Sequence, residues 1–254
     1  MGKIIAIANQ KGGVGKTTTA VNLVSALGER KKKCLIIDMD PQGNATSGLG
    51  MTKPALNESS HELLLGKKPA KELVSETAYD NVSIIAASMD LAGAEIELVD
   101  VQMREYKLKA ALAPIRNDYD YIIIDCPPSL GLITINALSA SDTILVPIQC
   151  EYFALEGLSH LTNTIARIKR VYNPQLEIEG VLMTMYDNRL NLTHEVAAQV
   201  KKYFPRQVFK TVIPRSVRLS EATSYGQPIN VFDKRNKGAQ AYDDLAKELI
   251  KRNR

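Results

Sequence analysis

Short apolar runs alternate with longer amphipathic stretches along the chain, and this pattern predicts the secondary structure. Apolar residues that recur every three to four positions predict long helices at Lys16–Arg30, Phe153–Val171, Thr193–Tyr203 and Gly238–Lys251. Runs rich in Ile, Leu and Val predict strands at Lys3–Ala8, Lys33–Asp38, Val82–Ala86, Tyr121–Asp125, Thr143–Ile148, Ile178–Thr184 and Val208–Thr211. Because strands alternate with helices, we expect an α/β fold with one mostly parallel, twisted sheet and helices on both faces.

Two stretches of the chain do not follow this simple alternation of strands and helices, or allow more than one interpretation. Residues 41–80 are rich in glycine and proline, and we interpret them as a mobile switch region followed by short helices. The last predicted helix carries an apolar stripe, which is typical of a helix packed on a core. A helix lying on a membrane surface is the alternative, but too few residues follow the stripe to form a separate amphipathic tail. The stripe consists of Ala239, Tyr242, Leu245, Ala246, Leu249 and Ile250.

Composition and charge narrow the class of protein. The 254 residues are 45% hydrophobic and 24% charged, which is typical of a globular protein. We expect neither a membrane span nor a signal peptide, because no apolar run nears ~20 residues and a strand begins at residue 3. The spacing of Cys34, Cys126 and Cys150 fits no zinc ribbon and predicts buried free thiols in a reducing cytoplasm.

Charge is uneven along the chain. Residues 1–160 hold 15 Lys and Arg against 19 Asp and Glu, whereas residues 161–254 hold 17 against 9. A basic C-terminal third suggests a surface for a polyanion, and solvated lysines on helix faces are an equally good explanation of charge alone.

The strongest functional signal is the glycine-rich loop NQKGGVGKTT at residues 9–18, between a predicted strand and a predicted helix. Glycines allow backbone N–H groups to surround an anion, and the helix dipole points at the same place. Lys16 would contact the β- and γ-phosphates of a nucleotide, and the Thr17 hydroxyl would contact Mg²⁺. The loop departs from the ordinary Walker A pattern, because Gln10 replaces a glycine and Lys11 adds a second cation that could stabilise charge in the transition state.

Carboxylates that end two other predicted strands would complete this site. Asp38 and Asp40 follow one apolar run, and side-chain alternation in an extended chain would place them on the same side. One of them would orient Mg²⁺ and the other the attacking water, although either could be a helix cap instead. Asp125 ends a Walker B-like strand and would hold Mg²⁺ through a water. The Pro127-Pro128 pair and Gly131 after it suit a segment that senses the γ-phosphate.

Together these motifs resemble the deviant Walker A ATPases, and within them the ParA/Soj chromosome-partitioning subgroup. The resemblance runs nearly end to end, and its long segments are more specific than the loop alone. It rests on residues 11–18 (KGGVGKTT), 38–50 (DMDPQGNATSGLG), 125–131 (DCPPSLG), 149–158 (QCEYFALEGL) and 213–222 (IPRSVRLSEA). The resemblance implies one P-loop NTPase domain over residues 1–254 that is a cytoplasmic, nucleoid-associated ATPase using ATP and Mg²⁺, with weak intrinsic turnover.

The resemblance also implies a working cycle and further site residues. ATP joins two subunits face to face, the dimer binds DNA without sequence preference, and a ParB-like partner triggers hydrolysis and release. Lys11 resembles the lysine that reaches the partner subunit's nucleotide. Pro214 and Ser216 lie where the family contacts adenine, but related proteins usually have asparagine at position 216. The nucleotide would thus be bound by Lys11, Gly12, Gly13, Val14, Gly15, Lys16, Thr17, Thr18, Pro214 and Ser216. Catalysis would use Lys11, Lys16 and Asp40, and the metal Thr17, Asp38 and Asp125.

For DNA, the resemblance singles out Arg189 and Arg218 in the basic third. Both match arginines that the family uses for DNA, and we expect contacts to phosphate and not to base edges. Either arginine could instead pair with a carboxylate such as Asp187 or Glu221, since surface pairs of this kind are common and weak.

Three other classes of protein compete with this hypothesis. A MinD-like regulator that cycles on a membrane would need an amphipathic tail. A relative of the nitrogenase iron protein would need clustered cysteines, and its spectrum would reveal a metal cluster. A non-enzymatic nucleotide sensor would show no turnover that depends on Lys16.

Overall fold

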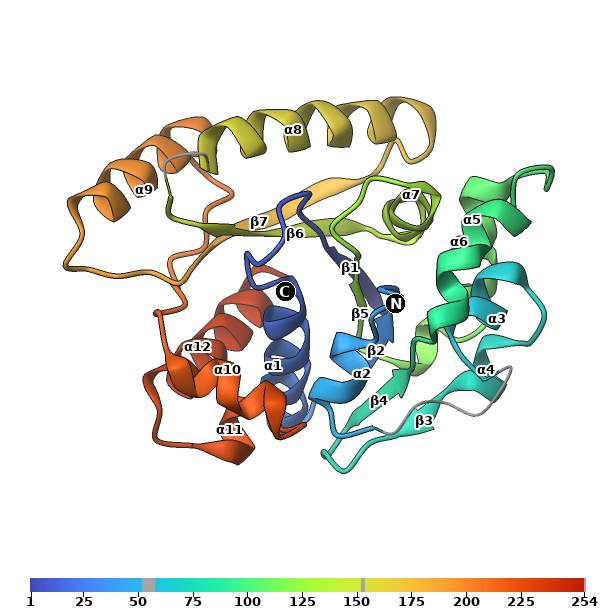
Figure 1. Cartoon of the computed structure of the whole chain (residues 1–254), viewed down its shortest axis with the longest axis horizontal. Coiled ribbons are helices and arrows are strands. Elements are labelled where there is room, and N and C mark those ends of the chain that lie inside the picture. The colour runs from blue at the N-terminus through green and yellow to red at the C-terminus, as the bar shows by residue number, and fades with distance from the viewer. Residues whose placement is uncertain (52–57, 152–153, 254) are drawn as a thin grey trace.

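One twisted sheet runs through the molecule (Figure 1). The computed structural model describes residues 1–51, 58–151 and 154–253. Within these ranges seven strands are hydrogen-bonded in the order β3-β4-β2-β5-β1-β6-β7, and all neighbours are parallel except β3 and β4. The strands are β1 (Lys3–Ile7), β2 (Cys34–Asp38), β3 (Ser75–Glu76), β4 (Val82–Ile85), β5 (Tyr121–Asp125), β6 (Thr143–Gln149) and β7 (Glu177–Thr184).

Helices cover both faces of the sheet, as predicted. One face packs against α1 (Lys16–Glu29), α2 (Asn44–Gly48), α10 (Val217–Ser224), α11 (Ile229–Phe232) and α12 (Lys237–Arg252). The other packs against α3 (Ser60–Leu65), α4 (Ala70–Leu73), α5 (Ala94–Glu97), α6 (Lys107–Leu112), α7 (Leu132–Ala140), α8 (Ala154–Val171) and α9 (Asn191–Tyr203). Short 3₁₀ turns occur at η1 (Met89–Gly93), η2 (Arg104–Tyr106) and η3 (Arg116–Asp118).

The alternation of side chains along each strand explains why two cores form. In β1, Ile4 and Ala6 belong to the core under α3 to α9, whereas Ile5 and Ile7 belong to the core under α1 and α12. Strands buried on both faces must be apolar throughout, which is why they appear as unbroken runs in the sequence. The carboxyl ends of β1, β2 and β5 meet at one edge, where Ile7 and Asp38 both align with Asp125.

Most predicted elements are confirmed to within two residues, and one strand is wrong. Residues 41–80 contain the short helices α2, α3 and α4, as expected, whereas the mobile switch predicted in the same segment stays a prediction. Residues 52–57 of this segment and the helix start predicted at Phe153 lie outside the described residues. The predicted strand Val208–Thr211 makes only a single bridge, from Val208 to Val181. Beyond it, the Glu248 carboxylate accepts the backbone N–H groups of Lys210 and Thr211 at 2.9 and 3.0 Å, so no ladder continues.

The apolar stripe of the last helix packs on the core, as predicted. Its members on α12 are buried or half-buried, with Tyr242, Leu245 and Leu249 fully enclosed, and the helix lies against α1. The apolar face that a membrane-surface helix would need is therefore already packed inside the protein. No helix in the described part of the chain is long and apolar enough to span a bilayer. All three cysteines are buried free thiols, again as predicted.

Candidate nucleotide-binding site

The glycine-rich loop joins the carboxyl end of β1 to the first turn of α1, which is the context that phosphate binding requires. Gly15, the residue before the helix, has a left-handed backbone with φ 86°, and no side chain caps the helix. A Cβ atom at Gly13 would meet nothing within 4 Å, so the space beside the loop is open. The first-turn N–H groups of α1 therefore face a space of the kind that accepts an anion.

Lys16 begins α1 and is held against the loop. Its side chain is only 7% exposed, and its Nζ donates to the backbone carbonyl of Lys11 at 3.2 Å. Burial lowers the pKa of Lys16, while the nearby Asp125, Cys126 and Asp40 groups oppose this shift. A buried ammonium next to open space is placed to pair with a phosphate, which would offset its desolvation.

Asp125, at the end of β5, is the most exceptional carboxylate of the site. It is fully buried, and among the described residues neither of its oxygens accepts a hydrogen bond of ordinary geometry. Burial and then the Asp38 carboxylate raise its pKa well above the usual value, and the Thr17 hydroxyl lies close enough to counter part of that rise. Buried oxygens without donors are costly unless an ion or its water shell satisfies them. Asp125 and Thr17 thus fit the Mg²⁺ role predicted for them.

Asp38, at the end of β2, has its oxygens already engaged. Oδ2 accepts from the backbone N–H and the hydroxyl of Thr46, both at 2.8 Å, and Oδ1 accepts from the Asp40 N–H at 3.1 Å. The Thr46 hydroxyl in turn accepts from the Ala87 N–H at 3.0 Å. Burial raises the pKa of Asp38, and the Thr46 bonds oppose that rise. Asp38 therefore anchors α2 to the edge of the sheet.

Asp40 differs from Asp38 because β2 ends before it. Strand alternation therefore does not govern Asp40, and the two carboxylates need not share one side as predicted. Asp40 is largely buried near Lys16, and its Oδ1 accepts from the Gln42 N–H at 3.0 Å. Within the described residues no group of three or more His, Cys, Asp or Glu side chains is arranged to hold a metal. A magnesium ion here would depend on one or two carboxylates together with phosphates and water, which is its usual mode in proteins.

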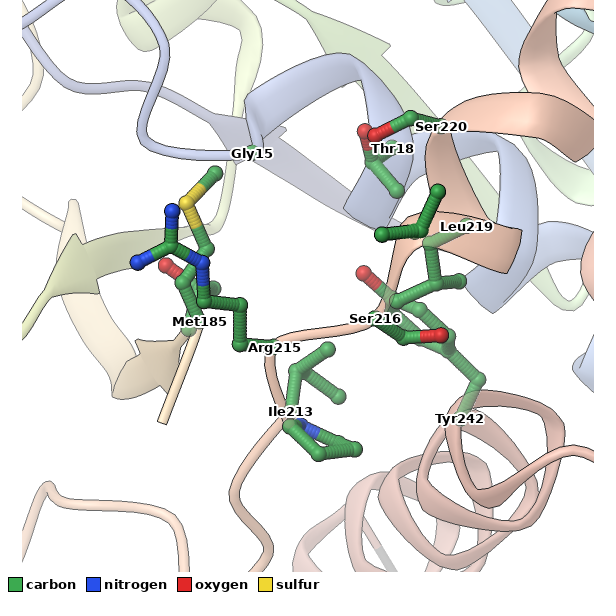
Figure 2. A pocket seen from close by; sticks show the side chains of 12 residues that line it. Gly15, Thr18, Met185, Ile213, Arg215, Ser216, Leu219, Ser220 and Tyr242 are labelled. Atoms are coloured by element: carbon green, nitrogen blue, oxygen red, sulfur yellow. The ribbon is translucent and has the colours of Figure 1, made fainter. Parts of the chain in front are cut away.

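A cavity of about 290 Å³ extends from the phosphate loop to the segment before α10. It begins at Gly15 and Thr18 and reaches Pro214 and Ser216, so the structure brings these predicted residues together. Figure 2 shows Met185 and Arg215 on one side of it and Thr18, Leu219 and Ser220 on the other. The Ser216 hydroxyl donates to Asn236 Oδ1 at 3.4 Å. The cavity has the position and the mixed polar and apolar lining that a nucleobase and ribose require.

Lys11 lies outside the residues that line this cavity, and it has a carboxylate partner. Its Nζ forms an ion pair with Glu151 at 2.8 Å, just past the end of β6, and both side chains are partly exposed. The Asn9 side chain fixes the backbone here, since it accepts from the Lys11 N–H at 3.0 Å and donates to the Pro147 carbonyl at 2.7 Å. Lys11 is therefore held on the surface beside the loop.

The two arginines predicted for DNA both have carboxylate partners. Arg189 pairs with Asp187 at 2.6 Å, although its side chain is 87% exposed. Arg218 pairs with Glu221 at 2.7 Å and Asp233 at 3.2 Å, and its guanidinium lies over the Phe232 ring. The ion pairs with carboxylates, which were expected from the sequence as the alternative to DNA contacts, are thus present at both arginines. Close by, Arg215, Arg235 and Lys237 line a groove of about 480 Å³ that shares Pro214 and Ser216 with the cavity.

Sequence reasoning missed two threonines of the site. The Thr184 hydroxyl, at the end of β7, donates to the Val14 carbonyl at 2.8 Å and so supports the loop from a distant strand. Thr46 holds Asp38 as described above. Thr184 carries the same signal as Asp38 and Asp125, a polar residue that ends an apolar strand, and this signal could have been applied to it.

The chain is similar to known proteins over nearly its whole length. A family model described as an AAA domain matches residues 2–178. The chain is 56% identical over 249 residues to the sporulation initiation inhibitor protein Soj of Bacillus subtilis, covering 98% of each chain. It is 52% identical over 252 residues to the chromosome partitioning protein ParA of Myxococcus xanthus, covering 99% of this chain and 89% of that one.

A solved structure shares the fold closely. It is described as cobyrinic acid a,c-diamide synthase from Mycobacterium smegmatis with a bound ATP analogue and magnesium. The TM-score is 0.86 at 37% sequence identity, over 99% of this chain and 95% of that one.

Proposed function

The chain belongs to the ParA/Soj family of chromosome-partitioning ATPases, and from this premise we propose that it hydrolyses ATP, with Mg²⁺, to drive DNA segregation. The observation that carries the proposal is the cavity that connects Gly15 and Thr18 to Pro214 and Ser216. It provides one continuous site for phosphates at the helix N-terminus and for a base next to Pro214.

The residues of the loop divide the work of binding ATP. The backbone from Gly12 to Thr18 would receive the phosphate oxygens, and Lys16 would neutralise the β- and γ-phosphates. Thr17 and Asp125 would hold Mg²⁺, which when bound withdraws charge from the phosphates being cleaved. Support for this metal comes from the unsatisfied oxygens of Asp125 in the described structure and from the magnesium in the similar M. smegmatis protein.

Asp40 is the better candidate for positioning the attacking water. The oxygens of Asp38 are occupied by Thr46 and by the Asp40 N–H, whereas in the described structure the protein engages only Oδ1 of Asp40. A general base or water-orienting group needs an oxygen that is free to accept from water. We therefore assign Asp38 to supporting the site from behind and Asp40 to the chemistry.

The cycle that follows couples ATP to two further partners. Lys11 would leave Glu151 and reach the nucleotide of a second copy, so that ATP favours the dimer because only the dimer completes its contacts. The dimer would present two copies of the basic surface that includes Arg189 and Arg218 to nucleoid DNA in the cytoplasm. A ParB-like protein would then accelerate an otherwise slow hydrolysis and release the DNA.

Two variants test the cycle by size-exclusion chromatography with ATP and Mg²⁺. Asp40→Ala should bind ATP, hydrolyse it at least about 100-fold more slowly, and accumulate as a dimer, because binding is kept while chemistry is lost. Lys11→Ala should bind ATP and remain a monomer. A wild-type dimer for Lys11→Ala would remove the cross-subunit role, and a monomeric Asp40→Ala would argue against Asp40 as the water-positioning residue.

A further inference from the structure

A second surface, on α5 and the turns that follow it, does not line the nucleotide cavity. Three large apolar side chains are exposed there: Ile96 is 78% exposed, Met103 67% and Val99 55%. We call these three residues the α5 patch. Met103 also has a left-handed backbone, with φ 54°, which is uncommon for a non-glycine residue. Exposed apolar side chains that gather on one segment are typical of an interaction surface.

The segment that carries the α5 patch is acidic, in a protein whose net charge is +4. Arg104 is the one basic residue between Met89 and Glu105, and five residues there are acidic: Asp90, Glu95, Glu97, Asp100 and Glu105. Arg104 already pairs with Glu105, and Lys67 and His61 share Glu97. A complementary partner would therefore bring apolar side chains together with positive charge.

The same segment is tied by one contact to the segment that follows Asp125, and by another to α3. Glu95 Oε1 accepts from the Ile133 N–H at 3.3 Å, in the first turn of α7, and a Cβ atom at Gly131 would lie only 2.1 Å from that oxygen. Gly131 is the last residue of the segment that leads from Asp125 to α7. Glu97 contacts His61 at 2.7 Å, on α3, and His61 also contacts Glu62. Through the Glu95 contact, a ligand that moves the turns around α5 would therefore disturb the segment that joins Asp125 to α7.

Building on the proposed function, we propose that the α5 patch is the docking surface for a basic segment with apolar side chains on the partner protein that stimulates ATP hydrolysis. Charge favours this occupant over a second copy, because a symmetric contact of the patch with itself would bring like charges together. Figure 1 shows α5 on the opposite side of the molecule from α10, α11 and α12. The α5 patch is thus separate from the DNA surface proposed around α10.

The test uses Val99→Asp and a matched control, Val171→Asp, at the end of α8. The two valines are similarly exposed, at 55% and 50%, so the substitution is the same and only the place differs. ATP turnover is titrated with the ParB-like protein from the same genome, in the presence of DNA. Basal turnover, ATP-dependent dimerisation and DNA binding are measured for each variant, which checks that both fold. Ile96→Asp serves as a second variant of the patch.

We expect Val99→Asp and Ile96→Asp to raise the half-saturating concentration of the partner at least about tenfold, with the other activities unchanged. Val171→Asp should match wild type. Stimulation of both patch variants at wild-type concentrations would overturn the proposal, and so would loss of the ATP-dependent dimer in Val99→Asp, which would make the patch a self-association surface. If the partner did not stimulate the wild type, the proposed function would fail first and the docking proposal with it.

Discussion

The phosphate loop and the basic surface around α10 hold their cations in opposite ways. Lys16 is buried, and its ammonium donates to the backbone of the loop itself. Arg189 is almost fully exposed and pairs with Asp187, two residues away in the sequence. Arg218 makes two carboxylate contacts on the surface. The buried cation has a position that the backbone defines, whereas each exposed cation has a partner that another anion can replace.

This difference indicates how each region should respond to change. Removing a buried group leaves neighbours such as Asp125 without their counter-charge, so its effect should be close to all-or-none. Exposed ion pairs contribute little to stability, and salt screens them. Substitutions on the basic surface should therefore give graded effects that depend on ionic strength.

The largest effect is expected for Lys16→Ala. Loss of the ammonium that faces the phosphates should reduce ATP turnover at least about 100-fold, as removal of one transition-state donor does in other enzymes. Steady-state phosphate release measures turnover, and a nucleotide-binding titration shows whether the loss begins at binding. Lys3→Ala, a lysine at the other end of β1, is the control. Turnover close to wild type in Lys16→Ala would contradict the assignment of the loop.

A smaller and salt-dependent effect is expected for Arg189→Ala and Arg218→Ala. Each phosphate contact contributes roughly −0.9 to the slope of log affinity against log salt, so each variant should flatten that slope by about one contact per subunit. DNA binding is titrated with ATP at several salt concentrations, and the ATP-dependent dimer is checked separately. Unchanged slopes in both variants would move the DNA surface to residues such as Arg215, Arg235 and Lys237, which line the neighbouring groove.

Asp187→Asn keeps Arg189 but removes its charged partner. The pKa of Asp187 lies well below the usual range because Arg189 donates to it, so the carboxylate is ionised and competes with phosphate for this guanidinium. Asp187→Asn should tighten DNA binding by a few-fold at low salt, and the gain should shrink as salt rises. Tighter binding that persists in the double variant with Arg189→Ala would show that the gain comes from net charge alone.

The smallest effect is expected for Glu151→Gln. Both Glu151 and Lys11 are partly exposed, and pairs of that kind contribute on the order of 0.2–1 kcal/mol. If Lys11 must leave Glu151 to reach a second subunit, the variant should dimerise at an ATP concentration lower by about two- to fivefold. Sedimentation or light scattering across an ATP titration measures this shift. A requirement for more ATP would mean that Glu151 positions Lys11 for the dimer.

Much of the fold could be predicted from the sequence, because the residue patterns that indicate strands and helices lie within short segments. The strands of a sheet that is covered on both faces are apolar throughout. The strands β2 and β5 end at Asp38 and Asp125, as predicted. Val208–Thr211 was predicted as a strand by the same rule, but the Glu248 carboxylate on α12 takes the N–H groups that a ladder would use. That competing acceptor lies 37 residues away, so no local pattern could reveal it.

By itself, the sequence determined the phosphate loop, its strand and helix, the apolar layers and the family, because each depends on residue types at fixed short spacings. Only the tertiary structure decided that Asp38 is satisfied by Thr46, that Asp125 is left with unsatisfied oxygens in the described chain, and that Arg189 and Arg218 have carboxylate partners. It also brought Pro214 and Ser216 to the same cavity as Gly15. The physical reason is common to these cases: hydrogen bonds, burial and charge act between atoms that are close in space, and the order of residues along the chain does not fix which atoms those are.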